Sequence, residues 1–104
     1  MLSFAALADP TRRRIVEMLA RGPLNAGEIA SRFTISASAI SQHLKVLRAA
    51  RLVRASVAAQ QRIYELDAEG LAEIERWIDG VGPIWRKRLD ALERERRLDP
   101  RTRP

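Results

Sequence analysis

Residues 36–54, SASAISQHLKVLRAARLVR, combine a helical pattern with an apolar segment that follows it directly. Ser36 is a residue type that caps helices. Ile40, Leu44 and Leu47 recur at spacings of four and three, which places them on one side of a helix ending near Ala50. The other side carries small polar residues first and cations later. A solvated surface is one explanation of that side, and close approach to an anionic partner is the other.

Two shorter helices are predicted before this one. In LADPTRRRIVEMLARG, residues 7–22, Asp9 can cap a helix, Pro10 suits its first position, and Gly22-Pro23 stops it. In NAGEIASRF, residues 25–33, Asn25 and Glu28 have the spacing of a capping box. The apolar residues expected to face the core in these two helices are Ile15, Val16, Leu19, Ile29, Ala30 and Phe33.

A β-hairpin is predicted after residue 51. The segments LVRASV and QQRIYEL, residues 52–57 and 60–66, are rich in strand-forming residues, with Arg54 and Arg62 among them. The linking residues AAQ, 58–60, contain no Gly, Asn or Asp, which tight two-residue turns favour. We therefore expect a looser, mobile tip.

The pattern returns to helix from Asp67 onward, with an apolar stripe that is long for so small a protein. The sequence GVGP, residues 80–83, predicts a kink or break into two segments, because Pro83 removes a helical hydrogen bond. We divide the chain into a helix-turn-helix region with a hairpin (1–66), a terminal dimerisation helix or kinked helix pair (67–98) and a tail (99–104). The residues expected at a dimer interface are Phe4, Leu7, Leu71, Ile74, Ile78, Val81, Trp85, Leu89 and Leu92.

Length and charge limit the classes of function. The 104 residues suit a single domain and carry a formal charge of +6. Residues 1–66 hold ten Lys/Arg against four Asp/Glu, whereas residues 67–104 hold nine of each, so the excess lies entirely in the first part. Such a charge fits a nucleic acid or a membrane surface. Its position around the helix at 36–50 favours nucleic acid.

The chain contains no cysteine, which excludes disulfides and thiolate metal sites. The N-terminal sequence MLSFAALADP lacks the basic start of an export signal, and no run of about 18 apolar residues occurs. We therefore expect a soluble cytoplasmic protein that does not span a membrane.

Two short helices, a turn, a third helix and a basic hairpin together predict a winged helix-turn-helix. The fold is mainly α with a small β-hairpin, the wing, and with terminal dimerisation helices. In this fold the third helix enters the major groove of DNA, where short polar groups approach base edges and cations meet phosphates. Ser38, Ser41 and Gln42 lie in its first half, and Lys45 and Arg48 follow.

The segments ALADPTRRRIVEML, SASAISQHLKVLRAARLV and RIYELDAEGL resemble the ArsR/SmtB family of bacterial and archaeal repressors. The resemblance implies a homodimer that binds a palindromic operator in double-stranded DNA through the helix at 36–50 and the wing at 52–66, and that an inducer releases. It also implies that Ala37, Ser38, Ser41 and Gln42 face the bases and that Arg54 and Arg62 lie on the wing. Together with the cap and the cations of the helix, the expected DNA-binding residues are Ser36, Ala37, Ser38, Ser41, Gln42, Lys45, Arg48, Arg54 and Arg62.

The chain departs from metal-sensing members of that family. Those proteins carry cysteines where this sequence has LNAGEIA, or His, Asp and Glu pairs on a terminal helix that contains no histidine here. We therefore place it in the non-metal-sensing branch, with no metal and no cofactor. The lone His43 is expected to pack at the edge of the core in preference to contacting DNA. Arg51 occupies a position where glycine is usual, which leaves the exit from the helix undecided.

Three further features of the sequence each have two interpretations. The side chains of Trp77, Trp85, Phe4 and Leu7 could line a pocket for a small-molecule effector, although an aromatic stripe at helical spacing favours a dimer core. The run at residues 12–14, three arginines, could contact phosphate or be solvated. No nucleophile has a base beside it, so we predict no enzyme. A protein-interaction module without specific DNA binding is the alternative to a repressor.

Overall fold

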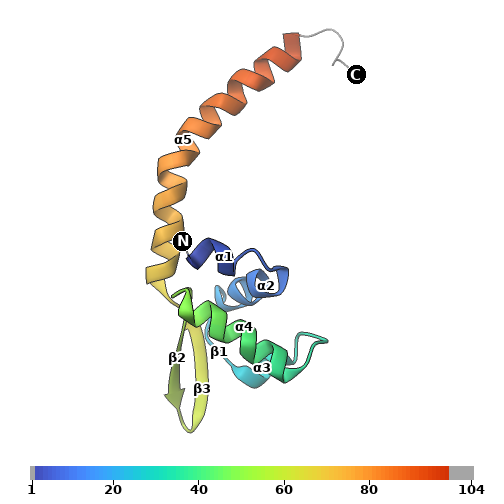
Figure 1. Ribbon diagram of the computed structural model, residues 1–104, viewed down its shortest axis with the longest axis vertical. Coiled ribbons are helices and arrows are strands. Elements are labelled where there is room, and N and C mark those ends of the chain that lie inside the picture. Colours follow the sequence, from blue (N-terminus) through green and yellow to red (C-terminus); the bar gives the residue numbers. More distant parts are fainter. Residues whose placement is uncertain (1, 99–104) are drawn as a thin grey trace. The chain divides into compact units, whose positions relative to one another are not determined.

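The structure, a computed structural model, describes residues 2–98 and confirms a mainly α winged helix-turn-helix (Figure 1). The chain divides into two compact units, residues 1–74 and the residues from 75 on. The predicted tail at 99–104 lies outside the described residues. The elements are α1 (Leu2–Ala6), α2 (Pro10–Leu19), β1 (Leu24–Asn25), α3 (Ala26–Ala30), α4 (Ala37–Ala49), β2 (Val53–Ala58), β3 (Gln61–Leu66) and α5 (Ala68–Leu98).

The three predicted helix caps are present. The Asp9 carboxylate accepts the backbone N–H of Arg12 at 3.0 Å. Asn25 and Glu28 form a complete capping box, with hydrogen bonds of 2.8 and 3.0 Å. The Ser36 hydroxyl accepts the N–H of Ala39 at 3.1 Å. Each cap satisfies a backbone donor that the helix itself leaves unpaired, so the helix starts follow from local sequence.

One apolar core holds the first unit together, and the inward sides of α2, α3 and α4 meet in it. Ile15, Ile29 and Leu47 have no exposed surface. Burial of such side chains stabilises the fold by about 1.5–3 kcal/mol each. The predicted core residues Val16, Ala30 and Phe33 are partly buried against it. The buried core residues are Ala6, Ile15, Met18, Leu19, Ile29, Ile40, Leu44, Leu47, Ala50, Leu52, Val53 and Tyr64.

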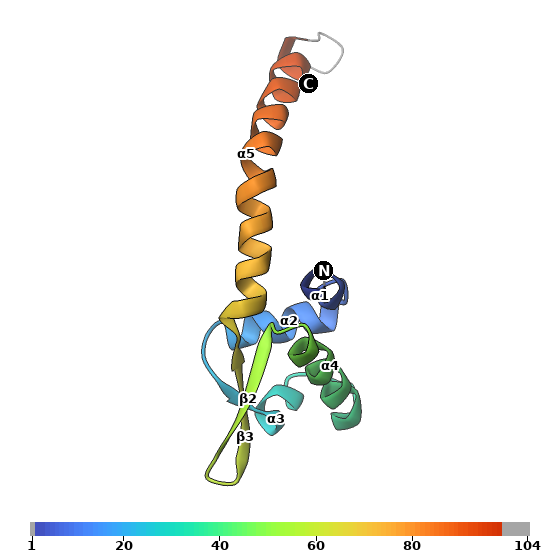
Figure 2. The ribbon, with the colours of Figure 1, turned by 60° about the vertical axis from the view of Figure 1, so that its left-hand side comes forward.

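The sheet has three antiparallel strands in the order β1-β3-β2. The hairpin of β2 and β3 extends beyond the helices of the first unit (Figures 1 and 2). β1 pairs Leu24 with Tyr64, and it was not predicted because two residues are too short to show an alternating pattern. In the hairpin, Arg54 lies opposite Glu65.

The exit from α4 is well defined although glycine is missing there. Arg51 has φ 59°, the left-handed conformation of a helix C′ residue. The N–H groups of Leu52 and Arg51 donate to the carbonyls of Leu47 and Arg48, at 3.1 and 3.0 Å, which is the Schellman pattern. The N–H of Gly70 then donates to the Arg51 carbonyl at 2.7 Å. A Cβ at position 70 would collide with that carbonyl, so only glycine permits this approach of α5 to the α4 exit.

The expectation of a loose wing tip is wrong. Ala58 pairs with Gln61, so only Ala59 and Gln60 connect the strands. Both residues have positive φ, 50° and 67°, the geometry of a tight type I′ turn. Strand pairing extends to the last residue on each side and closes the turn, even though Ala and Gln are unfavourable in the left-handed region.

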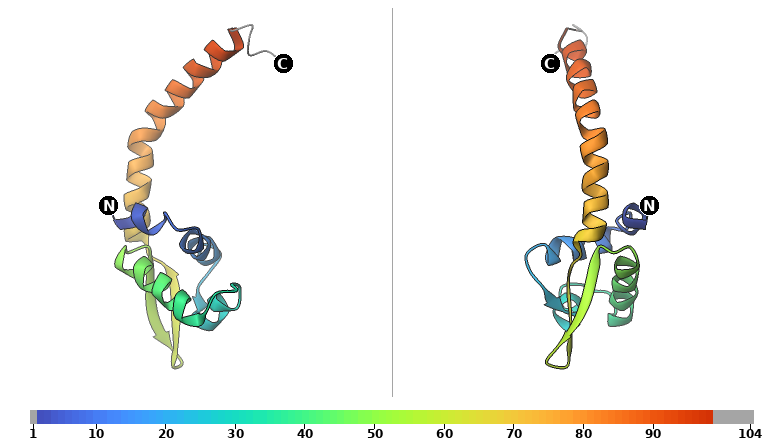
Figure 3. Two further views of the ribbon diagram at one scale, coloured as in Figure 1. Left: turned by 45° about the vertical axis from the view of Figure 1, so that its right-hand side comes forward. Right: turned by 90° about the vertical axis from the view of Figure 1, so that its left-hand side faces the viewer.

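Of the expected kink or break in the terminal helix, the break into two segments is wrong. α5 continues from Ala68 to Leu98 with Pro83 inside it (Figure 3). Pro83 removes one helical hydrogen bond, the one that its N–H would donate to the carbonyl of Asp79. The residues after Pro83 include Leu, Arg, Lys, Ala and Glu, which are good helix formers, so the helix resumes without interruption.

The wing turn gives a stability prediction. Replacing Ala59 by Asn and Gln60 by Gly should raise the free energy of unfolding by about 1–2 kcal/mol, because both new residues tolerate positive φ. Urea denaturation with an unchanged m-value would measure it. As a matched control, the same residues placed in the strands, Ala58→Asn with Gln61→Gly, should destabilise the protein. A double substitution in the turn that leaves the stability unchanged would contradict the assignment of this turn.

Candidate nucleic-acid interface

The outer face of α4 is the centre of the candidate interface. α3 and α4 form the helix-turn-helix, and the buried side of α4 packs on α2 and α3. The opposite face is exposed to solvent over its whole length. Small polar side chains occupy its first half and cations its second, as predicted. The exposed predicted site residues on this helix and at its start are Ser36, Ala37, Ser38, Ser41, Gln42, Lys45 and Arg48.

Ser36 lies at this surface and is also the N-cap residue of α4. Its hydroxyl oxygen caps α4, so the helix begins at a defined residue. The cap holds the first turn of the helix, which carries Ala37 and Ser38, in helical geometry. A surface that recognises bases needs such rigidity, because hydrogen bonds to base edges depend on orientation.

A polar cluster joins α4 to α2. The His43 Nδ1 lies 3.4 Å from an Nη1 of Arg12 and 3.9 Å from the Asp9 carboxylate. The Arg12 Nε also donates to the carbonyl of Ala6 at 2.6 Å. The backbone N–H of Arg12 beside it is the main cause that lowers the pKa of Asp9. His43 therefore lies half-buried at the edge of the core, as predicted, and contributes to holding α4.

The three arginines at 12–14 differ in environment. Arg12 bonds within the fold, as described above, and is half-buried. Arg14 lies over the ring of Phe33, with its guanidinium carbon 5.0 Å from the ring centroid. Arg13 is exposed. The run is therefore not one continuous phosphate-binding surface.

The wing carries fewer free cations than its sequence suggests. Arg54 donates to the carboxylate of Glu65 at 2.7 Å across the hairpin. Arg62 is exposed on β3, and Val57 presents 74% of its surface to solvent on β2. The apolar Val57 side chain was not predicted as part of the interface.

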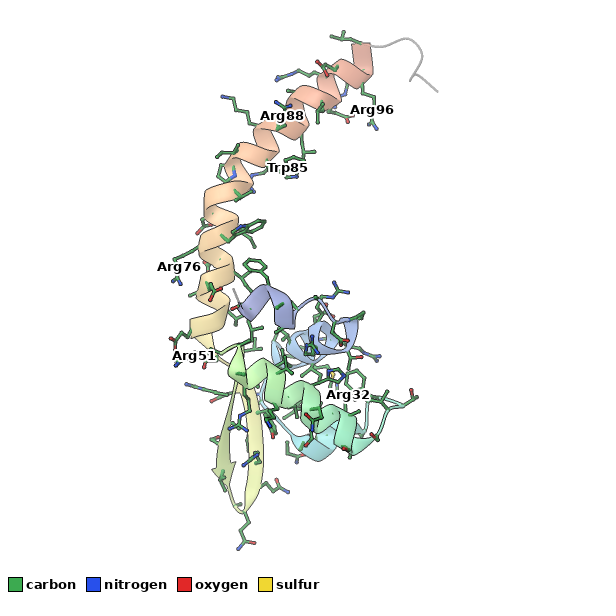
Figure 4. The ribbon with its side chains drawn as sticks, viewed as in Figure 1. Arg32, Arg51, Arg76, Trp85, Arg88 and Arg96 are labelled. Atoms are coloured by element: carbon green, nitrogen blue, oxygen red, sulfur yellow. The ribbon has the colours of Figure 1, made fainter. Side chains whose placement is uncertain are left out.

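An open basic groove lies between the second half of α4 and β2. Figure 4 labels Arg51, which lines this groove where α4 leads into the hairpin. Sequence reasoning missed Arg51 as a site residue, although its spacing of three from Arg48, itself three after Lys45, was a visible signal. The residues that line the basic groove are Lys45, Arg48, Ala49, Arg51, Val53, Arg54, Ala55 and Asp67.

The predicted dimer residues fall into two groups. Leu7, Leu71 and Ile74 are partly buried against the core of the first unit, and Phe4 is half-buried in α1. The others remain exposed on the second unit, and Figure 4 labels Trp85 among them. We call them the α5 stripe; their exposed fractions lie between 41% and 55%: Ile78, Val81, Trp85, Leu89 and Leu92. Trp77 and Ile84, at 49% and 74%, flank the stripe. The sequence placed Trp77 in either a ligand pocket or the dimer core, whereas Ile84 was not assigned to the interface.

Other kinds of site find no support in the described part of the chain. Among residues 2–98, no group of three or more His, Asp or Glu side chains could hold a metal ion. In the same residues, no helix is both long enough and apolar enough to cross a membrane.

Comparison with known proteins points to one family. Residues 9–55 match the family model described as "Bacterial regulatory protein, arsR family". The HTH-type transcriptional regulator Rv2034 of Mycobacterium tuberculosis is 52% identical over 77 residues, which cover 74% of this chain and 72% of that protein. The transcriptional repressor SdpR of Bacillus subtilis is 37% identical over 75 residues, covering 72% and 83%. A solved structure described as a possible transcriptional regulator for arsenical resistance superimposes with a TM-score of 0.74 at 38% identity, covering 91% of this chain and 96% of that one.

Proposed function

This chain belongs to the ArsR family of transcriptional regulators, and we propose that it is a homodimeric repressor that binds a palindromic operator through α4 and the wing. The observation that carries the proposal is the outer face of α4. It is held rigidly by the cap at Ser36 and the buried stripe beneath, and it is small and polar before Lys45 and basic after it. This is the order of side chains that a helix in the major groove requires.

Within this face, we assign base reading to the first half and phosphate contact to the second. The Gln42 amide can pair bidentately with adenine, and Ser38 and Ser41 are short enough to let the helix approach the bases. Lys45 and Arg48 would bind phosphates and set the register of the helix on the duplex. Arg54 and Arg62 would contact the backbone from the wing.

The exposed α5 stripe supports homodimerisation. Ile78, Val81, Trp85, Leu89 and Leu92 lie on one side of a helix, and each leaves at least 41% of its surface exposed. Apolar stripes of this kind pair in coiled-coil fashion, and a second copy supplies a matching stripe by symmetry. Two-fold symmetry would place the two copies of α4 in successive major grooves, about 34 Å apart.

The relative SdpR, 37% identical, is named a transcriptional repressor, and this supports repression of transcription for the present chain. Binding to chromosomal DNA would place the protein in the cytoplasm and requires no catalysis. An organic effector that releases DNA is compatible with this function and would show as ligand-dependent loss of binding. A protein-interaction module is the competing function, and DNA binding measured with the region upstream of its own gene distinguishes the two.

The division of roles along α4 can be tested by two substitutions. Gln42→Ala should relax sequence preference and cost about 1–3 kcal/mol of binding free energy on the preferred duplex. Lys45→Ala should weaken all duplexes alike and reduce the slope of log K against log salt by about one. Binding isotherms over a set of operator variants at several salt concentrations would measure both effects. The base-reading role of Gln42 is wrong if the ranking of operator variants is the same with and without it.

The proposed dimerisation through the α5 stripe can be tested by the molecular mass in solution of two variants. Leu89→Lys should convert a dimer at micromolar concentration into a monomer, because it places a charge in the apolar interface. Asp90→Asn is the matched control, since it makes the same change in net charge on the polar side of α5 and should leave the dimer intact. Sedimentation equilibrium would measure both masses. A monomeric mass for the unmodified chain would exclude the proposed dimer.

A further inference from the structure

The cations that line the basic groove come from the second half of α4, from its exit and from the start of β2. Lys45 and Arg48 come from α4, Arg51 from its exit, and Arg54 from β2. Among residues 2–98, Asp67 is the only acidic residue that lines it. The groove is open to solvent and has apolar walls at Ala49, Val53 and Ala55. Its chemistry therefore fits an extended, repeating anion.

Two of these four cations are already paired within the protein. Arg51 donates to the Glu69 carboxylate at 2.9 Å, and Arg54 donates to the Glu65 carboxylate at 2.7 Å. Both arginines and Glu69 keep about two thirds of their side-chain surface exposed, at 64–66%, and Glu65 keeps 34%. Exposed ion pairs of this kind are weak, so each arginine can exchange its carboxylate for another anion.

We propose that the basic groove holds one sugar-phosphate strand of duplex DNA, and that Glu65 and Glu69 limit DNA affinity by competing with phosphate for Arg54 and Arg51. The proposal rests on the proposed function. If α4 occupies the major groove and the wing lies beside it, the strand that separates two adjacent grooves of the duplex crosses the gap between α4 and β2. Binding then transfers each arginine from a carboxylate to a phosphate.

Arg51 is the informative residue because of its backbone conformation. At φ 59° a glycine would be more favourable than an arginine. The arginine at this position therefore makes the fold less stable than a glycine would. The residue can therefore be changed to glycine without damage to the fold. Arg51→Gly should be at least as stable as the original chain, and it separates loss of DNA contact from loss of folding.

The first experiment compares two substitutions of equal charge in the full chain. Glu69→Gln releases Arg51, whereas Glu17→Gln changes an exposed residue of α2 that lies outside the groove. Fluorescence anisotropy would measure binding to the DNA upstream of its own gene and to a scrambled duplex of the same composition. Glu69→Gln should raise the association constant several-fold on both duplexes and steepen the salt slope by about one. Glu65→Gln should act likewise through Arg54, and Glu17→Gln should have a much smaller effect.

The second experiment is a double-mutant cycle. If Glu69 acts through Arg51, the gain from Glu69→Gln should disappear in the Arg51→Gly background. A gain that persists there, or one no larger than that of Glu17→Gln, overturns the proposal. The scrambled duplex separates the groove proposal from the proposed function. Phosphate contacts in the groove should give the gain in affinity on any duplex, whatever its sequence. Equal affinity of the unmodified chain for both duplexes would instead count against sequence-specific recognition.

Discussion

The burial of one side of α4 is the constraint on which the rest of the structure depends. Ile40, Leu44 and Leu47 are 1%, 2% and 0% exposed, and they fix the rotation of the helix about its own axis. The buried stripe therefore also determines the direction in which every other side chain of α4 points. The small polar residues of its first half and the cations of its second face outward because the apolar stripe faces inward. The same residues therefore explain both stability and the surface available to a partner.

The start of each predicted helix and the inward side of α4 were predictable from sequence because their causes are local. A capping side chain lies three residues from the N–H that it accepts, and an apolar stripe repeats within one helix. The same local reasoning failed at two places, the wing turn and Pro83. At the turn, pairing between strands outweighs the preferences of Ala59 and Gln60. At Pro83, flanking helix formers outweigh one missing hydrogen bond.

The features missed altogether depend on contacts between distant segments. β1 exists because Leu24 meets Tyr64, forty positions later in the chain. Gly70 matters because its N–H reaches the Arg51 carbonyl. The pairing of Arg51 with Glu69 brings the end of α4 to the first turn of α5. Such contacts leave no periodic signal. The spacing of the groove's cations along α4 was visible in the sequence, but the carboxylates that pair with Arg51 and Arg54 could be seen only in the folded chain.

Recognition of a symmetric duplex by two copies of α4 can be tested by selection from a random duplex pool. The purified protein would retain duplexes at near-physiological salt, and the retained molecules would be sequenced. If two copies of α4 bind successive major grooves, the retained duplexes should share an inverted repeat with half-site centres one helical turn apart, about 34 Å. Retention without any enriched sequence, lost as salt is raised, would contradict it.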